Sequence, residues 1–238
     1  MILAAGFGTR LQPFTDELPK ALVPFCGKPM IEHVIEKMRN FGIERIVVNV
    51  HHKREKLIDY LRRNDFGAEI IISDEKENHL LTGGGIKNAI RFFGESENVI
   101  IHNTDIISSV DYGELLDFHT SHQAGITLAV RKKDDARVLL FDAEKNLVGW
   151  KNKSENKIRF RRNTEIYDEY GFTGVYVIAK EVFDFFPDKE KFDIIDFLLD
   201  ESKDFEILGF EDKSEFWFDL GSAEKIREAE KYFGCGNE

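Results

Sequence analysis

The residues best suited to chemistry lie near the start of the chain, where a short apolar segment runs into two glycines. The segment reads Leu3-Ala4-Ala5-Gly6-Phe7-Gly8-Thr9-Arg10-Leu11, and Lys20 follows it. Glycine admits positive φ and lets backbone N–H groups approach a ligand closely. Successive N–H groups in such a turn form a concave anion site, and Arg10 and Lys20 add full positive charges. The spacing therefore predicts an anion-binding turn.

Two other glycine-loop motifs fit this stretch poorly. A dinucleotide fingerprint needs a third glycine or alanine where Leu11 stands, and an acid at the end of the second strand, where His51 stands. A P-loop needs Gly-Lys-Ser/Thr, which Gly8-Thr9-Arg10 does not supply. A glycine turn without any ligand stays open, although Arg10 and Lys20 argue against it.

Two aspartates come directly after strand-like segments. Asp105 follows Asn98–His102, and Asp219 ends the segment Phe216–Asp219. In a parallel sheet ligands bind at the carboxyl ends of the strands, so Asp105 stands where a ligand site belongs. The alternatives are a turn-forming role for Asp105 and a helix-capping role for Asp219 near Ser222. We expect His102 to be a satisfied core group.

Strand-like and helical patterns alternate along the chain, which predicts an α/β fold. A mainly parallel sheet with helices on both faces follows from that alternation. The segments expected to be strands are 1–5, 46–50, 69–73, 98–102, 126–131, 172–178, 205–209 and 216–220. The segments expected to be helical are 31–38, 57–61, 112–122, 182–186, 194–202 and 223–233, the last with Ser222 as its N-cap.

The pattern differs between about residues 134 and 169. Arg137–Asp142 and Leu147–Asn152 resemble a short hairpin, and Arg159–Asp168 is polar enough to be a loop. We expect one domain over residues 1–238, with 134–169 as a lid-like insertion.

Composition excludes several classes of protein. The formal net charge of −11 argues against broad nucleic-acid binding, which needs a basic face. No apolar run approaches the ~20 residues that span a membrane, and no signal peptide is visible. We therefore expect a cytoplasmic protein without nucleic-acid or membrane partners. Cys26 and Cys235 lie far apart in the sequence and are interpreted as free thiols of a reduced compartment.

The glycine-rich start resembles the signature of the sugar-1-phosphate nucleotidyltransferases, or nucleotide-sugar pyrophosphorylases. The likeness includes Ala4–Leu11, Pro13, Thr15, Pro19–Pro24, Thr82–Ile86, Asn103–Asp105, Phe172–Tyr176 and Trp217–Ser222, and so spans nearly the whole chain. The triple glycine Gly83-Gly84-Gly85 and the compact length are most similar to N-acetylmuramate-1-phosphate uridylyltransferases and short mannose-1-phosphate guanylyltransferases.

The resemblance implies a Rossmann-like fold of the nucleotide-diphospho-sugar transferase type and a defined reaction. A nucleoside triphosphate and a sugar 1-phosphate would give a nucleoside-diphosphate sugar and pyrophosphate, with UTP or GTP as donor and N-acetylmuramate or mannose 1-phosphate as acceptor. Arg10 and Lys20 would hold the triphosphate and stabilise the leaving pyrophosphate. Nucleotide binding is expected at Leu3, Ala4, Ala5, Gly6, Gly8, Thr9, Arg10, Lys20 and Gly83, and sugar-phosphate binding at Thr173 and Gly174.

Asp105 and Asp219 are the hard oxygen ligands that Mg²⁺ accepts, and one or two carboxylates plus phosphates are a common Mg²⁺ ligand set. We expect both to hold one Mg²⁺. The chain departs from longer relatives at one place, because Trp150-Lys151-Asn152 stands where they carry a sugar-binding Glu-Lys-Pro motif. Two alternatives remain: a non-catalytic nucleotide-sugar sensor, and the same chemistry on a different phosphate acceptor. A monomer and a homodimer both fit the sequence.

Overall fold

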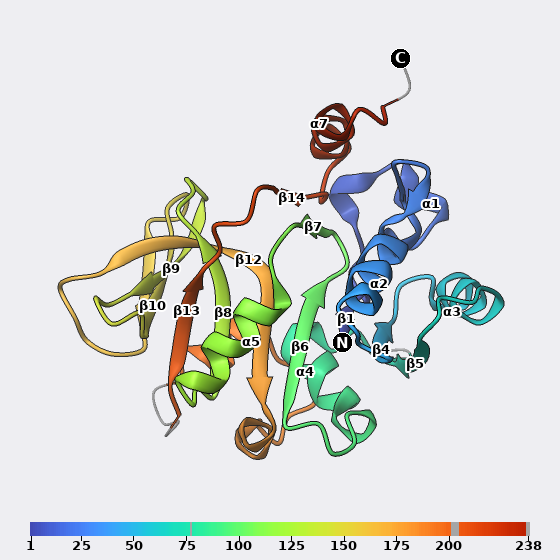
Figure 1. Ribbon diagram of the computed structural model, residues 1–238. Helices are drawn as coiled ribbons and strands as arrows, with labels where there is room; N and C mark the ends of the chain where they lie inside the picture. The colour runs from blue at the N-terminus through green and yellow to red at the C-terminus, as the bar shows by residue number, and fades with distance from the viewer. Residues whose placement is uncertain (77, 201–204, 237–238) are drawn as a thin grey trace.

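The central strands bury side chains on both of their faces, which requires helices on both sides of the sheet. In β4 (Arg45–Val50), Ile46 and Val48 belong to one apolar core and Val47 to the other. Helices α2 (Met30–Asn40), α3 (Arg54–Arg63) and α5 (Tyr112–Ser121) contribute to the first core. Helices α4 (Leu81–Ala89) and α6 (Ile194–Leu198) contribute to the second. The predicted α/β layering is confirmed (Figure 1).

The computed structural model describes residues 1–76, 78–200 and 205–236. Within these residues ten strands form one mixed, largely parallel sheet, ordered β11-β10-β9-β12-β6-β1-β4-β5, with β8 between β12 and β13. Its strands besides β4 are β1 (Ile2–Leu3), β5 (Glu69–Asp74), β6 (Asn98–Asn103), β8 (Ile126–Arg131), β9 (Arg137–Phe141), β10 (Leu147–Asn152), β11 (Lys157–Phe160), β12 (Asp168–Ala179) and β13 (Ile207–Glu211).

Two small pairs of strands lie outside the large sheet. They are β2 (Pro24–Phe25) with β3 (Lys28–Pro29), and β7 (Ile106–Ser108) with β14 (Trp217–Asp219). The remaining helices are α1 (Phe14–Glu17), α7 (Ala223–Phe233) and the 3₁₀ turns η1 (Thr9–Leu11), η2 (Lys20–Leu22), η3 (Ile90–Phe92) and η4 (Lys180–Phe185). The helix expected over 182–186 is thus a 3₁₀ helix, and the end of the one expected over 194–202 lies outside the described residues.

Strand directions fix which edge of the sheet can hold a site. β1 pairs in parallel with both β4 and β6. β12 pairs antiparallel with both β6 and β8, so β6 and β8 run in the same direction. The carboxyl ends of β1, β4, β6 and β8 therefore meet at one edge, the upper edge in Figure 1.

The segment 134–169 extends the main sheet through β9, which pairs with the first residues of β12. The expected hairpin is present as β9 and β10. A third strand, β11, replaces the first part of the loop expected over Arg159–Asp168. The sequence obscures this strand because it is short and because its two apolar residues, Ile158 and Phe160, are exposed at the sheet edge and not buried in a core.

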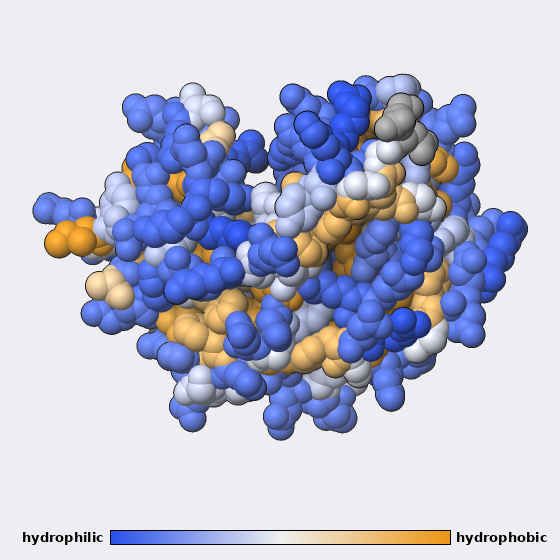
Figure 2. All heavy atoms as spheres, turned by 45° about the horizontal axis from the view of Figure 1, so that its top comes forward, coloured by the Kyte–Doolittle hydropathy of each residue, from blue (hydrophilic) through white to orange (hydrophobic). Residues whose placement is uncertain are grey.

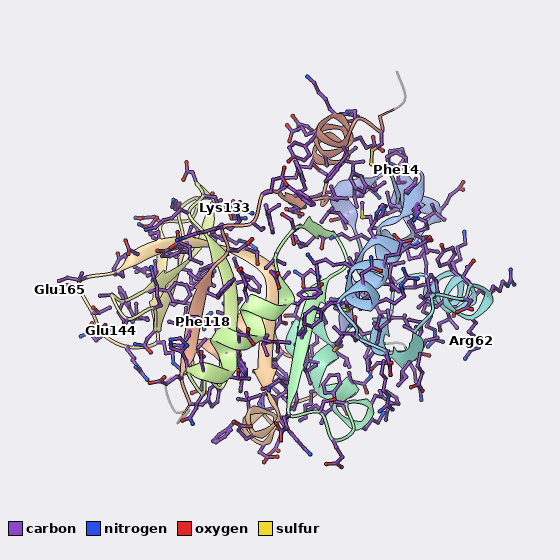
Figure 3. All side chains as sticks on the ribbon, viewed as in Figure 1. Phe14, Arg62, Phe118, Lys133, Glu144 and Glu165 are labelled. Carbon is purple, nitrogen blue, oxygen red and sulfur yellow. A yellow bond between two sulfur atoms is a disulfide. The ribbon has the colours of Figure 1, made fainter. Side chains whose placement is uncertain are left out.

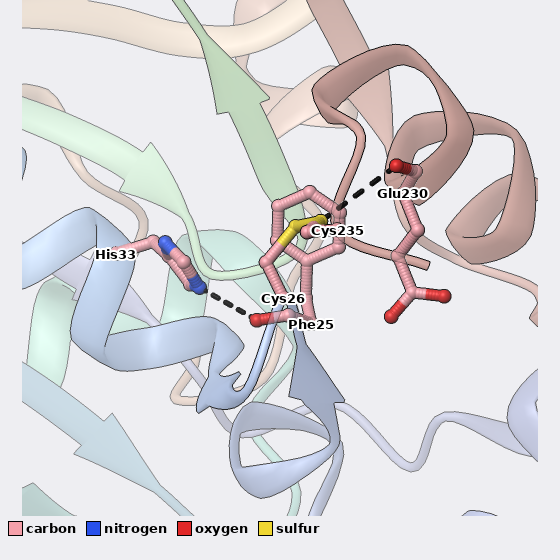
Figure 4. Close-up of a disulfide and its surroundings, with 5 residues drawn as sticks. All are labelled: Phe25, Cys26, His33, Glu230 and Cys235. Carbon is pink, nitrogen blue, oxygen red and sulfur yellow. Dashed lines mark hydrogen bonds between the residues drawn. A yellow bond between two sulfur atoms is a disulfide. The ribbon is translucent and has the colours of Figure 1, made fainter. Parts of the chain in front are cut away.

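The interpretation of Cys26 and Cys235 as free thiols is wrong in this structure. The two form a disulfide with a Cα–Cα distance of 5.2 Å across 209 positions of sequence (Figure 4). Helix α7 makes this possible by packing Ile226 and Ala229 into the cluster that also contains Phe25. Separation in sequence says nothing about this contact, because it depends on the chain returning to its own beginning.

Candidate active site

Hydrogen bonds from the backbone and from side chains fix the conformation of the loop after β1. Gly8 has φ +65°, and a Cβ there would come within 2.8 Å of Thr15 and 3.0 Å of Lys20. The Thr15 hydroxyl donates to the carbonyl oxygen of Gly8 at 2.9 Å. The N–H of Ala4 donates to Asn49 Oδ1 at 2.7 Å, which joins the loop to β4. The expected anion-binding turn thus has the strained, close-packed geometry that only glycine allows at Gly8.

A cavity of about 350 Å³ lies at the carboxyl ends of β1, β4 and β6. It is lined by Leu3, Ala5, Gly6, Lys20, Asn49, His79, Leu81, Thr82, Asn103, Thr104, Asp105 and Asp193. Five of the residues singled out from the sequence, Leu3, Ala5, Gly6, Lys20 and Asp105, therefore share one cavity. Figure 2 shows the upper face of the molecule, where hydrophilic residues predominate and apolar patches lie between them.

Lys20 and Asp105 form an ion pair with 2.5 Å between Lys20 Nζ and Asp105 Oδ2. Only 16% of the Lys20 side chain and 13% of the Asp105 side chain are exposed. The sequence separates them by 85 positions, and the topology joins them, because Asp105 follows β6 while Lys20 follows the β1 loop. Because the pair is largely buried, its charges act on a ligand through a lower effective dielectric, and so more strongly, than the same charges would in bulk water.

Asp219, at the end of β14, is paired with one lysine and has an arginine nearby. Lys225 Nζ lies 2.6 Å from Asp219 Oδ2. A Cβ built on Gly221 would lie 2.7 Å from Arg10 Nη2 and 2.8 Å from Asp219 Oδ1. The Arg10 guanidinium and the Asp219 carboxylate therefore both lie beside Gly221. Burial favours a higher pKa for Asp219, but the hydrogen bond from Lys225 and the charges of Lys225 and Lys20 prevail, and its pKa is lowered.

Asp105 and Asp219 come from neighbouring backbone segments. β14 pairs with β7 so that Asp219 stands opposite Ile106, and the N–H of Leu220 donates to the carbonyl oxygen of Asp105 at 2.8 Å. Mg²⁺ commonly takes only one or two carboxylates together with phosphate oxygens, so these two residues form a sufficient protein ligand set. Within 1–76, 78–200 and 205–236, no three histidine, cysteine, aspartate or glutamate residues gather in a metal-binding group. The donor set fits a phosphate-bound Mg²⁺ better than a protein-enclosed metal.

The triple glycine forms the first turns of α4 and allows very close packing there. A Cβ on Gly83 would come within 2.3 Å of the Phe192 ring, and one on Gly84 within 2.2 Å of the carbonyl oxygen of Glu190. Gly83 therefore packs against Phe192, while its neighbours Leu81 and Thr82 line the cavity. The helix begins at Leu81, so all three glycines lie inside it.

A buried hydrogen-bonded bridge connects the two walls of the cavity. Asn49 accepts from Ala4 N–H and donates through Nδ2 to Glu75 Oε1 at 2.7 Å. Glu75 Oε2 accepts from the N–H of Leu80 at 2.9 Å, just before α4. Burial raises the pKa of Glu75, against the opposing effect of those two donors. This bridge is not predictable from the sequence, because nothing local marks Asn49 or Glu75 beyond their positions at the ends of β4 and β5.

Thr173 and Gly174 lie in an irregular part of β12. Thr173 is fully buried and donates through its hydroxyl to the carbonyl oxygen of Ala129 at 2.8 Å. Gly174 has φ +81°, and the pairing of β12 with β8 shifts register between Phe172 and Tyr176. A Cβ on Gly174 would meet Asn103 Nδ2 at 2.8 Å, so this glycine packs closely on the strand end that precedes Asp105.

His102 has the structural role expected for it. It is fully buried, donates through Nε2 to the carbonyl oxygen of Ile106 at 3.1 Å and accepts at Nδ1 from the hydroxyl of Tyr112. Burial lowers its pKa to about 3. The neutral ring therefore supports the turn that presents Asp105, from behind the cavity.

Comparison with known proteins agrees with this geometry. A family model described as "Nucleotidyl transferase" matches residues 1–233. The chain belongs to the nucleotidyl transferase family. It is 40% identical over 120 residues to an N-acetylmuramate alpha-1-phosphate uridylyltransferase from Caulobacter vibrioides, covering 49% of this chain and 49% of that protein. It is 36% identical over 138 residues to mannose-1-phosphate guanyltransferase 2 from Candida glabrata, covering 57% of this chain and 38% of that protein.

A solved structure extends this similarity to the whole length of the nucleotidyl transferase chain. HddC from Yersinia pseudotuberculosis superposes with a TM-score of 0.76 at 26% identity, covering 98% of this chain and 97% of that one. A second structure of HddC is complexed with GMP-PN. By contrast, the sequence matches to the curated relatives above cover half or less of their length. No helix among the described residues is long and apolar enough to cross a membrane.

Proposed function

We propose that this chain transfers a nucleotidyl group from a nucleoside triphosphate to a sugar 1-phosphate. The observation that carries the proposal is the gathering of Arg10, Lys20 and Lys225 around Asp105 and Asp219 at one edge of the sheet. Two polyanions must meet there and pyrophosphate must leave, so positioned cations are the main requirement. Family membership and the likeness to HddC support the same chemistry.

The reaction needs no general base, because the attacking phosphate oxygen of the sugar 1-phosphate is already anionic. That oxygen forms a bond to the α-phosphorus, and the bond from the α-phosphorus to the bridging oxygen of the β-phosphate breaks. The electron pair leaves with pyrophosphate. Arg10 grips phosphate oxygens with its planar fork and Lys20 acts as a point charge, which together stabilise the leaving group.

Substrate positioning falls to the backbone and to the carboxylates. The loop from Ala4 to Thr9 and the segment of Gly83 would contact the nucleotide, and Thr173 and Gly174 would border the sugar phosphate. Asp105 and Asp219 would hold a Mg²⁺, which when bound neutralises phosphate charge. In the ligand-free protein Lys20 and Lys225 neutralise these two carboxylates instead.

We infer UTP or GTP as donor, and N-acetylmuramate 1-phosphate or mannose 1-phosphate as acceptor. The two kinds of curated relatives named above support these pairs. At the place of the longer relatives' Glu-Lys-Pro motif, Lys151 is paired with Glu169 at 2.7 Å.

Pyrophosphate release tests the proposal. Purified protein with Mg²⁺, each of UTP, GTP, CTP, ATP and dTTP, and a panel of sugar 1-phosphates should release pyrophosphate with at least one pair. Lys20→Met should abolish release, whereas the control Lys28→Met, at an exposed ion pair with Glu36, should keep it. No release with any pair contradicts the proposal. A thermal shift with nucleotide sugars but no release would indicate a sensor instead.

A further inference from the structure

Lys133 lies at the same edge of the sheet as the candidate active site, although no motif marks it. It follows the carboxyl end of β8 by two residues. Because β8 runs in the same direction as β6, this end lies at the edge where Asp105 follows β6. Figure 3 shows Lys133 at the top of β8, beside the chain that leads into β14.

The side chain of Lys133 is held against the strand that ends in Asp219. Its Nζ lies 3.5 Å from the centroid of the Trp217 ring and 2.7 Å from Asp135 Oδ2. Trp217 is two residues before Asp219, and its indole N–H donates to the carbonyl oxygen of Thr173 at 2.8 Å. The ammonium group therefore lies next to the strand that ends in Asp219, and this strand is hydrogen-bonded to the segment of Thr173 and Gly174, which is expected to border the acceptor phosphate.

Burial and charge make Lys133 unlike the other lysines of its loop. Only 21% of its side chain is exposed, and a Cβ on Gly171 would come within 2.1 Å of Lys133 Cε. Burial lowers the pKa of Lys133, while Asp135 and Asp219 favour its charged form. Lys132, the preceding residue, is 53% exposed and pairs with Asp168. Lys133 therefore contributes to the electrostatic field around Asp219, whereas Lys132 lies at the surface of the protein.

We propose that Lys133 binds the phosphate of the acceptor, the sugar 1-phosphate. This inference rests on the proposed function. Asp135 holds the ammonium group in place without substrate, and an acceptor phosphate beside Asp219 takes over one of its N–H donors. The aromatic ring below fixes the position of the charge. The cations at this edge then have separate roles: Arg10 and Lys20 bind the triphosphate, and Lys133 binds the acceptor phosphate.

Steady-state kinetics of Lys133→Met test this division. With the most active substrate pair, the KM for the sugar 1-phosphate should rise about tenfold or more, as expected for losing one charge-assisted hydrogen bond. The KM for the triphosphate should change less than about threefold. Lys133→Arg should restore part of the acceptor affinity, because it keeps the charge. Lys132→Met is the matched control and should leave both KM values unchanged.

The outcomes separate this inference from the proposed function. An active wild type whose Lys133→Met variant keeps the acceptor KM overturns the assignment of Lys133 and leaves the proposed function standing. Equal rises in both KM values also overturn it, because they indicate a merely structural role. A wild type without turnover contradicts the proposed function. Calorimetric titration with mannose 1-phosphate and N-acetylmuramate 1-phosphate then decides: binding lost only in Lys133→Met supports the inference, and any other result overturns it.

Discussion

Single charged residues at the candidate active site are paired with one another before any substrate binds. Lys20 is paired with Asp105, and Lys225 with Asp219. A phosphate group can replace the carboxylate partner of each lysine, and a divalent cation can replace the lysine partner of each aspartate. Neither the Asp105 nor the Asp219 carboxylate is therefore buried without a partner in the ligand-free protein. A buried, unpaired charge would cost several kcal/mol.

Asp105→Asn tests the role of one such charge. The substitution keeps the shape of the side chain and the backbone carbonyl that accepts from Leu220 N–H. We expect kcat/KM to fall by at least about 100-fold, with the melting temperature changed by no more than about 3 °C. Asp111→Asn is the control, because Asp111 caps α5 and asparagine caps equally well. Full activity in Asp105→Asn would remove this residue from the site.

Sequence spacing predicts some site residues and hides others for a physical reason. Asp105 is recognisable because it follows a strand of the large sheet, and the carboxyl ends of parallel strands meet at one edge. Asp219 ends a strand-like segment outside that sheet, and Gly8 belongs to the glycine-rich turn after the first strand. Asn49 and Glu75 also stand at strand ends, but an isolated amide or acid there is common. Their importance arises only from hydrogen bonds across 45 and 26 positions of sequence, which no local pattern encodes.

Among the elements, α4 depends on glycine for its contacts. Replacing a helical glycine by alanine normally stabilises a protein by up to about 1 kcal/mol. At Gly84 the new Cβ would lie 2.2 Å from the carbonyl oxygen of Glu190 and 2.9 Å from Leu80 Cβ. Because a backbone atom blocks it, we expect Gly84→Ala to lower the free energy of unfolding by about 2 kcal/mol or more. Urea unfolding measures this, and a variant as stable as the wild type would contradict the packing described.

Helix α7 positions Lys225 beside Asp219 and is fastened by the Cys26–Cys235 disulfide. A cross-link over such a long loop stabilises mainly by restricting the unfolded chain, typically by about 2–4 kcal/mol. We expect dithiothreitol to lower the melting temperature by several degrees. The double variant Cys26→Ser/Cys235→Ser should melt at the lowered temperature with or without reductant. If the wild type melts identically in both conditions, the disulfide does not form in solution.

Elements with strong apolar alternation are predictable, and those stabilised by their neighbours are not. The sequence identifies β4, β5 and β8 almost to the residue, because each carries a short run rich in apolar and β-branched residues. It misses β11, which is an exposed edge strand, and it misses η4 as a 3₁₀ helix. The long-range Cys26–Cys235 contact is likewise not predictable from the sequence, because it depends on how α7 packs against the start of the chain.

The whole molecule carries a net charge of −11, yet its candidate active site gathers cations. Exposed charges are screened beyond about 8 Å at physiological salt, so the acid excess elsewhere does not prevent a polyanion from binding. The acids at the site act locally as partners for lysines, and in the proposed function they also hold Mg²⁺.

Stability of the whole molecule should fall at moderately acidic pH because of His102. Burial lowers its pKa to about 3 in the folded protein, whereas an unfolded histidine titrates near 6.5. Between these two pKa values the unfolded chain binds a proton at this histidine and the folded protein does not. The free energy of unfolding therefore decreases as pH falls below about 6.5, by about 1 kcal/mol per pH unit. Urea unfolding between pH 7 and 5 should show a shallower slope for His102→Asn. Parallel slopes would contradict a neutral, buried His102.

The central claim, nucleotidyl transfer at this cationic edge, is tested most directly by following the α-phosphate. A nucleoside triphosphate labelled at the α-phosphorus is incubated with protein, Mg²⁺ and the accepted sugar 1-phosphate. We predict that the label enters the nucleoside-diphosphate sugar, that pyrophosphate is released unlabelled, and that Lys20→Met loses both products. Label that remains in the triphosphate, or that appears as free nucleoside monophosphate, would contradict the claim.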